Sequence, residues 1–374
     1  MRIPQFELTR QYAVIEAEIE AALRRVLRSG RFILGAEGQA FEAECAATLG
    51  VEHAIGVASG SDALQLTLRA LRVGPGDEVI TAAFSFVSSA RAVLQIGARP
   101  VFADVDRRTF NLDPRAVEAA MTDRTRAVVA VDIYGYPCEL DELRALCADR
   151  GIALIEDACE ALGARYKGRA IGSQGSSAVF AFYPNKQMTT GEGGMVTTHS
   201  EDQWRLLRSL RNQGRADSGG WLEHARLGFN YRLDDVRAAM GIGQLEKLDE
   251  ILASREAVAA RYSELLGAIP GLELPCADDP DHERSWFVYV VTLPVETDRE
   301  AVIARLDAHG IQTARYLPCI HLQPYMQQRF GFEAGLCPVA EELSSRTLAL
   351  PFHARLGQDD QEYVAAALES ALTF

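Results

Sequence analysis

The 374-residue sequence lacks the features that mark several common classes of protein. Basic residues are scarce relative to acidic ones, with 38 Lys and Arg against 52 Asp and Glu, so the formal net charge is −14. This balance argues against a nucleic-acid-binding surface, because contacts with the phosphate backbone need clustered Lys and Arg. No apolar run approaches the roughly 18 residues that span a membrane, and residues 1–12 carry no apolar signal core. The sequence therefore predicts a soluble, cytoplasmic globular protein.

Several short motifs are also missing. The seven cysteines are widely spaced and form no C-x-x-C pair, which is typical of reduced thiols and not of a disulfide framework or a zinc site. There is no G-x-x-x-x-G-K-[ST] motif and no G-x-G-x-x-G after a strand, so ATP and NAD binding lose their main support. Because H-E-x-x-H and G-x-S-x-G are absent too, the sequence predicts neither a metal site nor a Ser-His-Asp hydrolase.

The hydrophobic pattern predicts an α/β fold. Short apolar runs that read as buried strands alternate with helical stretches, and they lie at 54–58, 78–82, 100–103, 127–132, 153–157 and 178–182. This alternation implies a mostly parallel sheet covered on both faces, with ligand sites outside the carboxyl ends of its strands. A helical stretch over about 236–266 then leads to a smaller α/β unit with strands at 285–293 and 311–317. We predict a large domain over 1–245, with N-terminal helices, and a small C-terminal domain over 246–374.

One lysine occupies an unusual position. The stretch 179–198, VFAFYPNKQMTTGEGGMVTT, places Lys186 between an apolar strand and a glycine-rich turn, after which a further strand begins. The GEGG sequence allows the backbone to fold back tightly. A lysine held at the edge of a buried sheet loses hydration, which lowers its pKa and makes its amine nucleophilic. Lys186 is therefore a candidate for imine chemistry.

Asp157 ends the apolar strand in ALIEDACEALGA, 29 residues before Lys186. A carboxylate beside a pyridine nitrogen keeps that nitrogen protonated, because an opposite charge nearby favours the charged form. Such a partner lets a pyridoxal phosphate (PLP) ring act as an electron sink. Alternatively, Asp157 caps a following helix. Together with Lys186, the cofactor role is the favoured interpretation.

Other positions carry weaker signals. A Ser-Gly-Ser turn after a strand, with Gly60 and Ser61, suits an anion bound by backbone N–H groups at a helix start. Phe86 follows another predicted strand and either stacks on a flat cofactor or belongs to the core. Asn230 lies just before a helix, which suits a helix cap, a phosphate contact or a subunit contact. His321 is the only histidine within a polar and aromatic loop.

Taken together, these motifs resemble the DegT/StrS family of PLP-dependent sugar aminotransferases, which have the aspartate aminotransferase fold (fold type I). The likeness covers nearly the whole chain. It is carried by SGRFILG, ASGSDALQLTLRAL, GPGDEVI, FSFVSSA, RPVFADVD, TFNLD, IEDACEALGA, FYPNKQMTTGEGGM, GFNYRLDDVRAAMGIGQLEKLD and YLPCIHLQPYM.

The resemblance implies roles for matching positions. Lys186 looks like the lysine that forms a Schiff base with PLP, and Asp157 like the partner of the pyridine nitrogen. Phe86 falls at the position that stacks on the ring. The phosphate-binding turn is matched by Gly60 with Ser61. The family also implies a homodimer with active sites at the subunit interface, in which Asn230 reaches the phosphate of the neighbouring subunit.

The sequence departs from the commonest family pattern at two positions. Ala181 stands where many members have a serine that contacts the phosphate, so that contact is lost or replaced. Glu160 stands where many members have glutamine near the PLP 3′-oxygen. The resemblance also makes Tyr183, Tyr316 and His321 candidate substrate contacts.

As a function, the resemblance implies transfer of an amino group from an amino acid, L-glutamate by analogy, to a keto sugar linked to dTDP, UDP or GDP. Pyridoxamine phosphate would be the intermediate form of the cofactor. Glu160 resembles members that aminate GDP-linked 4-keto-6-deoxy sugars, whereas residues 11–35 resemble members that aminate C3, so the carbon stays open. A cyclitol ketone as acceptor, or a catalytically silent ligand-sensing protein, are the alternatives. Related sugar 3-dehydratases carry histidine in place of Lys186, which argues against that activity.

Overall fold

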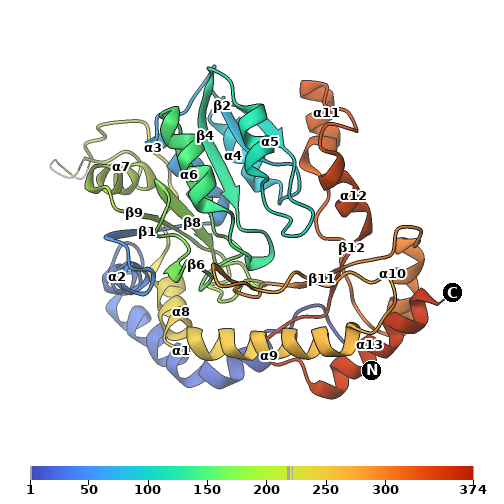
Figure 1. The fold of residues 1–374 in the computed structure, drawn as a ribbon. Coiled ribbons are helices and arrows are strands. Elements are labelled where there is room, and N and C mark those ends of the chain that lie inside the picture. The colour runs from blue at the N-terminus through green and yellow to red at the C-terminus, as the bar shows by residue number, and fades with distance from the viewer. Residues whose placement is uncertain (1, 217–219, 221, 374) are drawn as a thin grey trace.

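The computed structural model describes residues 2–216, 220 and 222–373, and it contains the predicted sheet (Figure 1). Seven strands lie side by side in the order β1-β9-β8-β5-β4-β2-β3. Their bounds are β1 (His53–Val57), β2 (Glu78–Ala82), β3 (Arg99–Ala103), β4 (Thr125–Val131), β5 (Ala153–Asp157), β8 (Ser177–Ala181) and β9 (Gly194–Thr198). Strand β9 is the one that runs antiparallel to the strands on both of its sides, β1 and β8. The predicted α/β fold with a mostly parallel sheet is confirmed.

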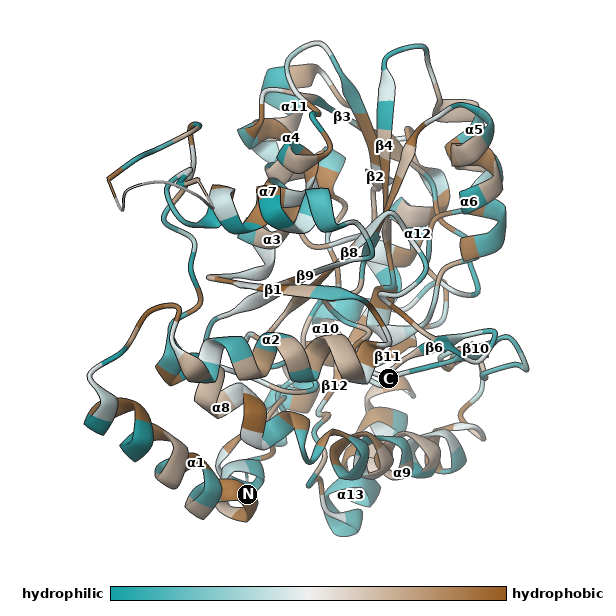
Figure 2. Cartoon of the chain, turned by 90° about the vertical axis from the view of Figure 1, so that its left-hand side faces the viewer, coloured by the Kyte–Doolittle hydropathy of each residue, from teal (hydrophilic) through white to brown (hydrophobic). Residues whose placement is uncertain are grey.

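Helices cover both faces of this sheet, as its buried, apolar strands require (Figure 2). On one side, α5 and α6 pack together, and on the other α3 packs against α4 and α7. These helices span α3 (Gly60–Ala70), α4 (Ser88–Gln95), α5 (Pro114–Ala120), α6 (Leu140–Asp149) and α7 (Glu201–Arg211). The strands β2, β5 and β8 therefore deliver their carboxyl ends to one edge, where a ligand site is expected.

Each of the two N-terminal helices ends at a glycine. Helix α1 (Thr9–Ser29) stops at Gly30 and α2 (Ala36–Leu49) stops at Gly50, and both glycines are left-handed, with φ of 64° and 67°. A residue with a side chain is strained in that conformation, so glycine is the usual helix terminator. Both helices pack on α8 (Asp235–Leu245).

The C-terminal part differs from the prediction in two places. The expected long helix over 236–266 is broken at Glu246 and Lys247 into α8 and α9 (Leu248–Leu266). The segment 311–317 forms no strand and makes only single bridges, from Ile311 to Ile3 and from Ala314 to Ala349. The strand within 285–293 exists as β11 (Tyr289–Thr292), which pairs with β12 (Thr347–Leu350).

A second hydrophobic core forms around these two strands, between α9, α10 (Arg299–Ala308) and α13 (Gln358–Leu372). Helices α11 (Pro324–Phe330) and α12 (Pro338–Arg346) return to the large sheet, since Asp104 after β3 accepts bonds from the Val339 and Ala340 N–H groups.

Short elements complete the chain: β6 (Arg165–Tyr166), β7 (Arg169–Ala170), β10 (His282–Glu283), η1 (Ile133–Gly135) and η2 (Ile320–Leu322). The domain boundary near residue 245 stays a prediction. Among the described residues, no helix combines the length and the apolar character needed to cross a membrane.

Candidate active site

Lys186 lies in the turn between β8 and β9, at the carboxyl edge of the sheet. Its side chain is only 14% exposed, and its Nζ lies 3.4 Å from Oε1 of Glu160. On another side, the same Nζ lies 4.1 Å from the centre of the Phe287 ring. The backbone is fixed as well, because the Lys186 N–H donates to the Tyr183 carbonyl at 3.0 Å. The sheet thus holds one amine nearly out of water, between a carboxylate and an aromatic face.

Asp157 is the last residue of β5, the strand that pairs in parallel with β8. The residue is 4% exposed. Its Oδ2 accepts a hydrogen bond from Ser89 Oγ at 3.1 Å, and its Oδ1 accepts one from the Cys159 N–H at 3.3 Å. Burial raises the pKa of Asp157, while the bonds from Cys159 and Ser89 and the charge of Lys186 act to lower that pKa. The alternative role as a helix cap is wrong, because residues 158–164 form turns and no helix.

Glu160 links Lys186 to the backbone of the turn that follows β4. While one carboxylate oxygen faces Lys186, the other accepts the Tyr134 N–H at 3.0 Å. That N–H belongs to a tight turn, in which Tyr134 and Gly135 have φ of 58° and 83°. A Cβ at Gly135 would lie 1.7 Å from the Ser285 carbonyl oxygen, so only glycine fits there. The turn therefore fixes the direction in which the Glu160 carboxylate points.

The predicted anion-binding turn begins α3. Ser59 caps this helix by accepting the Asp62 N–H, and Gly60 is its first residue. A Cβ on Gly60 would lie 2.6 Å from the Cβ of Ala181 at the end of β8, so the glycine permits close packing of the helix start against that strand. Ser61 Oγ lies 2.7 Å from the Oγ of Ser88, the first residue of α4. Free N–H groups at a helix start and two hydroxyls suit a phosphate.

Two predicted aromatic residues are exposed near this edge. Phe86 is 60% exposed in the loop after β2, so the alternative that it belongs to the core is wrong. Tyr183 precedes Lys186 and is also exposed. Tyr316 has more contacts that fix its side chain. Its hydroxyl accepts a hydrogen bond from Asn185 at 3.3 Å, and the centre of its ring lies 6.3 Å from that of Phe287. Burial raises the pKa of Tyr316 to about 12, so its hydroxyl stays protonated at neutral pH.

Two other predicted residues do not join this group. His321 is fully buried in η2, where its Nε2 lies 2.9 Å from Glu341 and its ring packs against Phe102. A substrate contact by His321 stays a prediction. Asn230 is exposed and accepts a bond from Arg232. Its alternative role as a helix cap is wrong, because Asp234 caps α8.

Sequence reasoning missed four residues of the site: Ser88, Ser89, Tyr134 and Phe287. The two serines stand directly after Phe86 and Val87 at the carboxyl edge of β2, and that position was a usable signal. Tyr134 contributes mainly a backbone N–H, which every residue except proline carries. Phe287 comes from the C-terminal part of the chain, so nothing near it in sequence points to Lys186.

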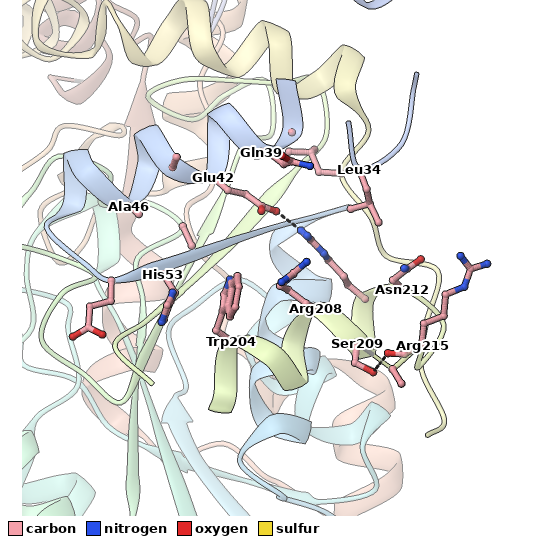
Figure 3. Close-up of a pocket in the computed structure, with 17 residues that line it drawn as sticks. Leu34, Gln39, Glu42, Ala46, His53, Trp204, Arg208, Ser209, Asn212 and Arg215 are labelled. Atoms are coloured by element: carbon pink, nitrogen blue, oxygen red, sulfur yellow. Dashed lines mark hydrogen bonds and ion pairs between the residues drawn. The ribbon is translucent and has the colours of Figure 1, made fainter. Parts of the chain in front are cut away.

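A cavity of about 610 Å³ lies elsewhere, between α2, β1 and α7, and neither Lys186 nor Asp157 lines it (Figure 3). Glu42 and Arg211 form an ion pair across it. The pair also holds strand β1, because Gly56 donates its N–H to Glu42 at 2.9 Å and accepts from Arg211 at 2.6 Å. Strand β1 leads directly into the Ser59–Gly60 turn, so this ion pair holds the strand that positions the turn.

We expect Arg211→Ala to lower the free energy of unfolding by about 3–5 kcal/mol, because it leaves Glu42 without its cation and the Gly56 carbonyl without its donor. Denaturant unfolding of the apo protein measures this change. Arg208→Ala is the matched control, since that exposed side chain in the same cavity stacks over Trp204 and forms no ion pair among the described residues, and the substitution should cost about 1 kcal/mol or less. Equal losses in the two variants would contradict a supporting role for the buried pair.

Comparison with known proteins places this geometry in a family. A dTDP-3-amino-3,4,6-trideoxy-alpha-D-glucose transaminase from Streptomyces venezuelae is 41% identical over 352 residues, covering 94% of this chain and 91% of that protein. A protein from Geobacillus stearothermophilus named a pleiotropic regulatory protein is 37% identical over 367 residues, 97% of each chain. The crystal structure of S. venezuelae DesV in complex with a ketimine intermediate is 40% identical, with a TM-score of 0.93 over 99% of this chain and 98% of that one.

The family model that matches covers residues 13–369, which is nearly the full length that the sequence motifs indicated. That span includes both the sheet edge with Lys186 and Asp157 and the C-terminal core. The chain belongs to the DegT/DnrJ/EryC1/StrS aminotransferase family.

Proposed function

We propose that this chain transfers an amino group from an amino acid, L-glutamate, to the keto carbon of a nucleotide-linked sugar, with PLP bound to Lys186. One observation carries the proposal. Neighbouring parallel strands β5 and β8 bring a buried carboxylate, Asp157, and a nearly buried amine, Lys186, to the same edge of the sheet. An amine kept from water is suited to imine formation, and a carboxylate there is suited to hold a protonated ring nitrogen.

The aminotransferases of this family depend on PLP, and the residues present fit that group. Asp157 accepts bonds from Ser89 and Cys159, which use only part of the roughly four acceptor directions of a carboxylate. A buried carboxylate with spare capacity suits a pyridine N–H. The start of α3 with Ser61 and Ser88 offers donors for a phosphate, although Ala181 supplies no hydroxyl. Phe86 offers an exposed ring for stacking.

PLP, when bound, supplies an electron sink for the electron pair released at the amino-acid Cα. The chain's own groups do the rest in this proposal. Lys186 would hold the cofactor at its carbonyl carbon, and, once the amino donor had taken that place, the free Lys186 amine would move the donor Cα proton to the cofactor carbon. Glu160 and Phe287 orient that amine. Asp157 keeps a proton on the ring nitrogen. With the keto sugar, Lys186 returns a proton to the sugar carbon that receives the amino group.

The proposed acceptor follows from the relatives. The S. venezuelae relative is by name a dTDP-sugar transaminase, and it matches this chain over nearly its whole length. The proposed sugar contacts are the exposed Tyr183, whose carbonyl accepts the Lys186 N–H, and the Tyr316 hydroxyl, which bonds to Asn185 next to Lys186. The rival that this chain is a catalytically silent sensor draws on the regulatory name of one relative. The presence of both Lys186 and Asp157 in the arrangement above argues against it.

The test is the absorbance spectrum of the purified protein with PLP, before and after L-glutamate is added. We expect a visible band for PLP bound to Lys186, which glutamate shifts to shorter wavelength with release of 2-oxoglutarate. A panel of dTDP-, UDP- and GDP-linked 3-keto and 4-keto sugars, with an inosose-type cyclitol ketone alongside, then identifies the acceptor. A protein that never develops the band would support the silent sensor, and amination of the cyclitol ketone alone would support that rival.

The proposed assembly is a homodimer in which each active site takes Asn230 from the other subunit. Asn230 is exposed, and the segment that carries it pairs with the end of β1, where Arg232 bridges to Val57 just before the phosphate turn. An exposed amide beside one phosphate turn is well placed to reach a second copy of that turn across a twofold axis.

Mixing inactive subunits tests this arrangement. Lys186→Ala and Asn230→Ala proteins, each impaired alone, should regain part of the wild-type activity when refolded together. A shared site makes one of the two sites in each heterodimer complete, because its Lys186 and its Asn230 come from the two different chains. If Asn230 serves its own subunit, no complete site forms and mixing restores nothing. Sedimentation of the wild-type protein checks that a dimer exists.

A further inference from the structure

A short chain of buried hydroxyl groups leads to Asp157. Ser89 Oγ lies 3.1 Å from Asp157 Oδ2, and Ser85 Oγ lies 3.3 Å from Ser89 Oγ. Both serines are 2% exposed. They stand on either side of the start of α4, the helix that follows β2, so the chain crosses from one strand loop to the end of β5.

The direction of these hydrogen bonds follows from the chemistry of the groups. An ionised carboxylate only accepts, so Ser89 must donate its one hydroxyl proton to Asp157. Ser85 must then be the donor to Ser89. A hydroxyl bonded in this way to a buried carboxylate favours the ionised form, and it opposes the effect of burial, which favours the neutral form.

We propose that Ser89 is a positioning residue for the amino-transfer reaction, which holds Asp157 ionised and aimed at the cofactor ring nitrogen. The inference rests on the proposed role of Asp157 and adds a residue to it. Among the described residues, the Ser89 hydroxyl bonds to Asp157 and Ser85 and not to Lys186. Its hydroxyl fixes Oδ2 from one side, while the Cys159 N–H fixes Oδ1 from the other. The remaining acceptor directions of the carboxylate are left for the ring N–H.

The test compares Ser89→Ala with Ser85→Ala in the full-length protein. Loss of a hydrogen bond to a charged group corresponds to about a 10- to 100-fold effect, so Ser89→Ala should lower kcat/KM by that factor. It should also weaken binding of PLP to the apo protein, followed by absorbance titration, about tenfold. Ser85→Ala removes an equally buried hydroxyl that does not touch Asp157 and should change either quantity by less than about threefold. Ser89→Cys, which keeps a weak donor, should lie between the two.

A double-mutant cycle with Asp157→Asn separates positioning from general damage to the fold. If Ser89 acts through the charge of Asp157, adding Ser89→Ala to the Asp157→Asn variant should lower kcat/KM by less than about a further twofold. An equal cost in both backgrounds, or equal effects of Ser89→Ala and Ser85→Ala, would overturn the inference. Thermal unfolding of the apo variants shows whether a loss of activity reflects a loss of folded protein. If Ser89→Ala is unfolded, Ser89→Cys takes its place in the comparison with Ser85→Ala. Activity retained by Asp157→Asn alone would instead refute the proposed function.

Discussion

Replacing Lys186 with alanine should abolish amino transfer and the visible band of bound PLP. The substitution removes both the amine that binds the cofactor and the base that moves the Cα proton. Loss of acid–base catalysis alone costs on the order of 10² to 10⁴ in rate, and loss of the covalent link adds to that. Turnover with L-glutamate and a keto sugar measures the rate, and the absorbance spectrum reports the link. The effect should be the largest of any single substitution in this chain.

Two variants sharpen this experiment. Lys186→Arg keeps a cation for Glu160, which faces Nζ at 3.4 Å, but it offers no comparable nucleophile. It should therefore be as inactive as the alanine variant while remaining folded. Lys167→Ala removes an exposed lysine that pairs with Asp141 and should leave turnover unchanged. Near-normal turnover by either Lys186 variant would remove that residue from the mechanism.

The second large effect is expected for Asp157→Asn, which should lower kcat/KM by about 10² to 10⁴. Asparagine has nearly the same shape, but it carries no charge to keep the ring nitrogen protonated. The pH profile should change as well. In the wild type, activity should fall at acid pH as Asp157 gains a proton, and this acid limb should disappear from the residual activity of the variant.

Stability distinguishes this loss from damage to the fold. Burial raises the pKa of Asp157 above its unfolded value, so the apo protein loses stability as the pH rises from the unfolded pKa through the folded one. Asparagine removes that loss, and we expect the apo variant to be no less stable than the wild type at pH 7. Asp132→Asn is the matched control, because it neutralises a comparably buried carboxyl that accepts from the Cys138 N–H, while the backbone N–H that Asp132 donates to the Asp157 carbonyl is kept, so turnover should stay nearly unchanged. Equal losses in both variants would contradict a specific role for Asp157.

The sequence allowed the sheet and its two central chemical groups to be predicted. The strands ending at Asp157 and preceding Lys186 are short, apolar runs bounded by polar or glycine-rich turns, and such runs form buried parallel strands because both of their faces are covered. Since the carboxyl ends of parallel strands meet at one edge, the two residues could be placed near each other from the sequence. The left-handed stops at Gly30 and Gly50 were predictable for a similarly local reason.

Contacts between distant segments were not predictable in this way. Ser89 precedes Asp157 by 68 residues, and its hydrogen bond depends on where the start of α4 lies relative to the end of β5. Phe287 reaches Lys186 from the C-terminal part of the chain. His321 lies in a polar and aromatic loop that resembles a ligand site, yet its ring is buried against Phe102 and Glu341. Burial of one side chain is set by what packs over it, and a single sequence does not show that.

The sequence by itself determined the order of strands and helices, the family, and the identity of the amine and the carboxylate at the sheet edge. The elements and the two groups follow from local patterns of apolar residues, glycines and charged groups, and the family follows from the resemblance of the motifs to DegT/StrS members. The tertiary structure decided how those groups are held. It placed Glu160 between Lys186 and the Tyr134 N–H, and it set Ser89 against Asp157. The physical reason is that the direction and charge state of a buried group depend on its neighbours in space, and these neighbours come from separate loops.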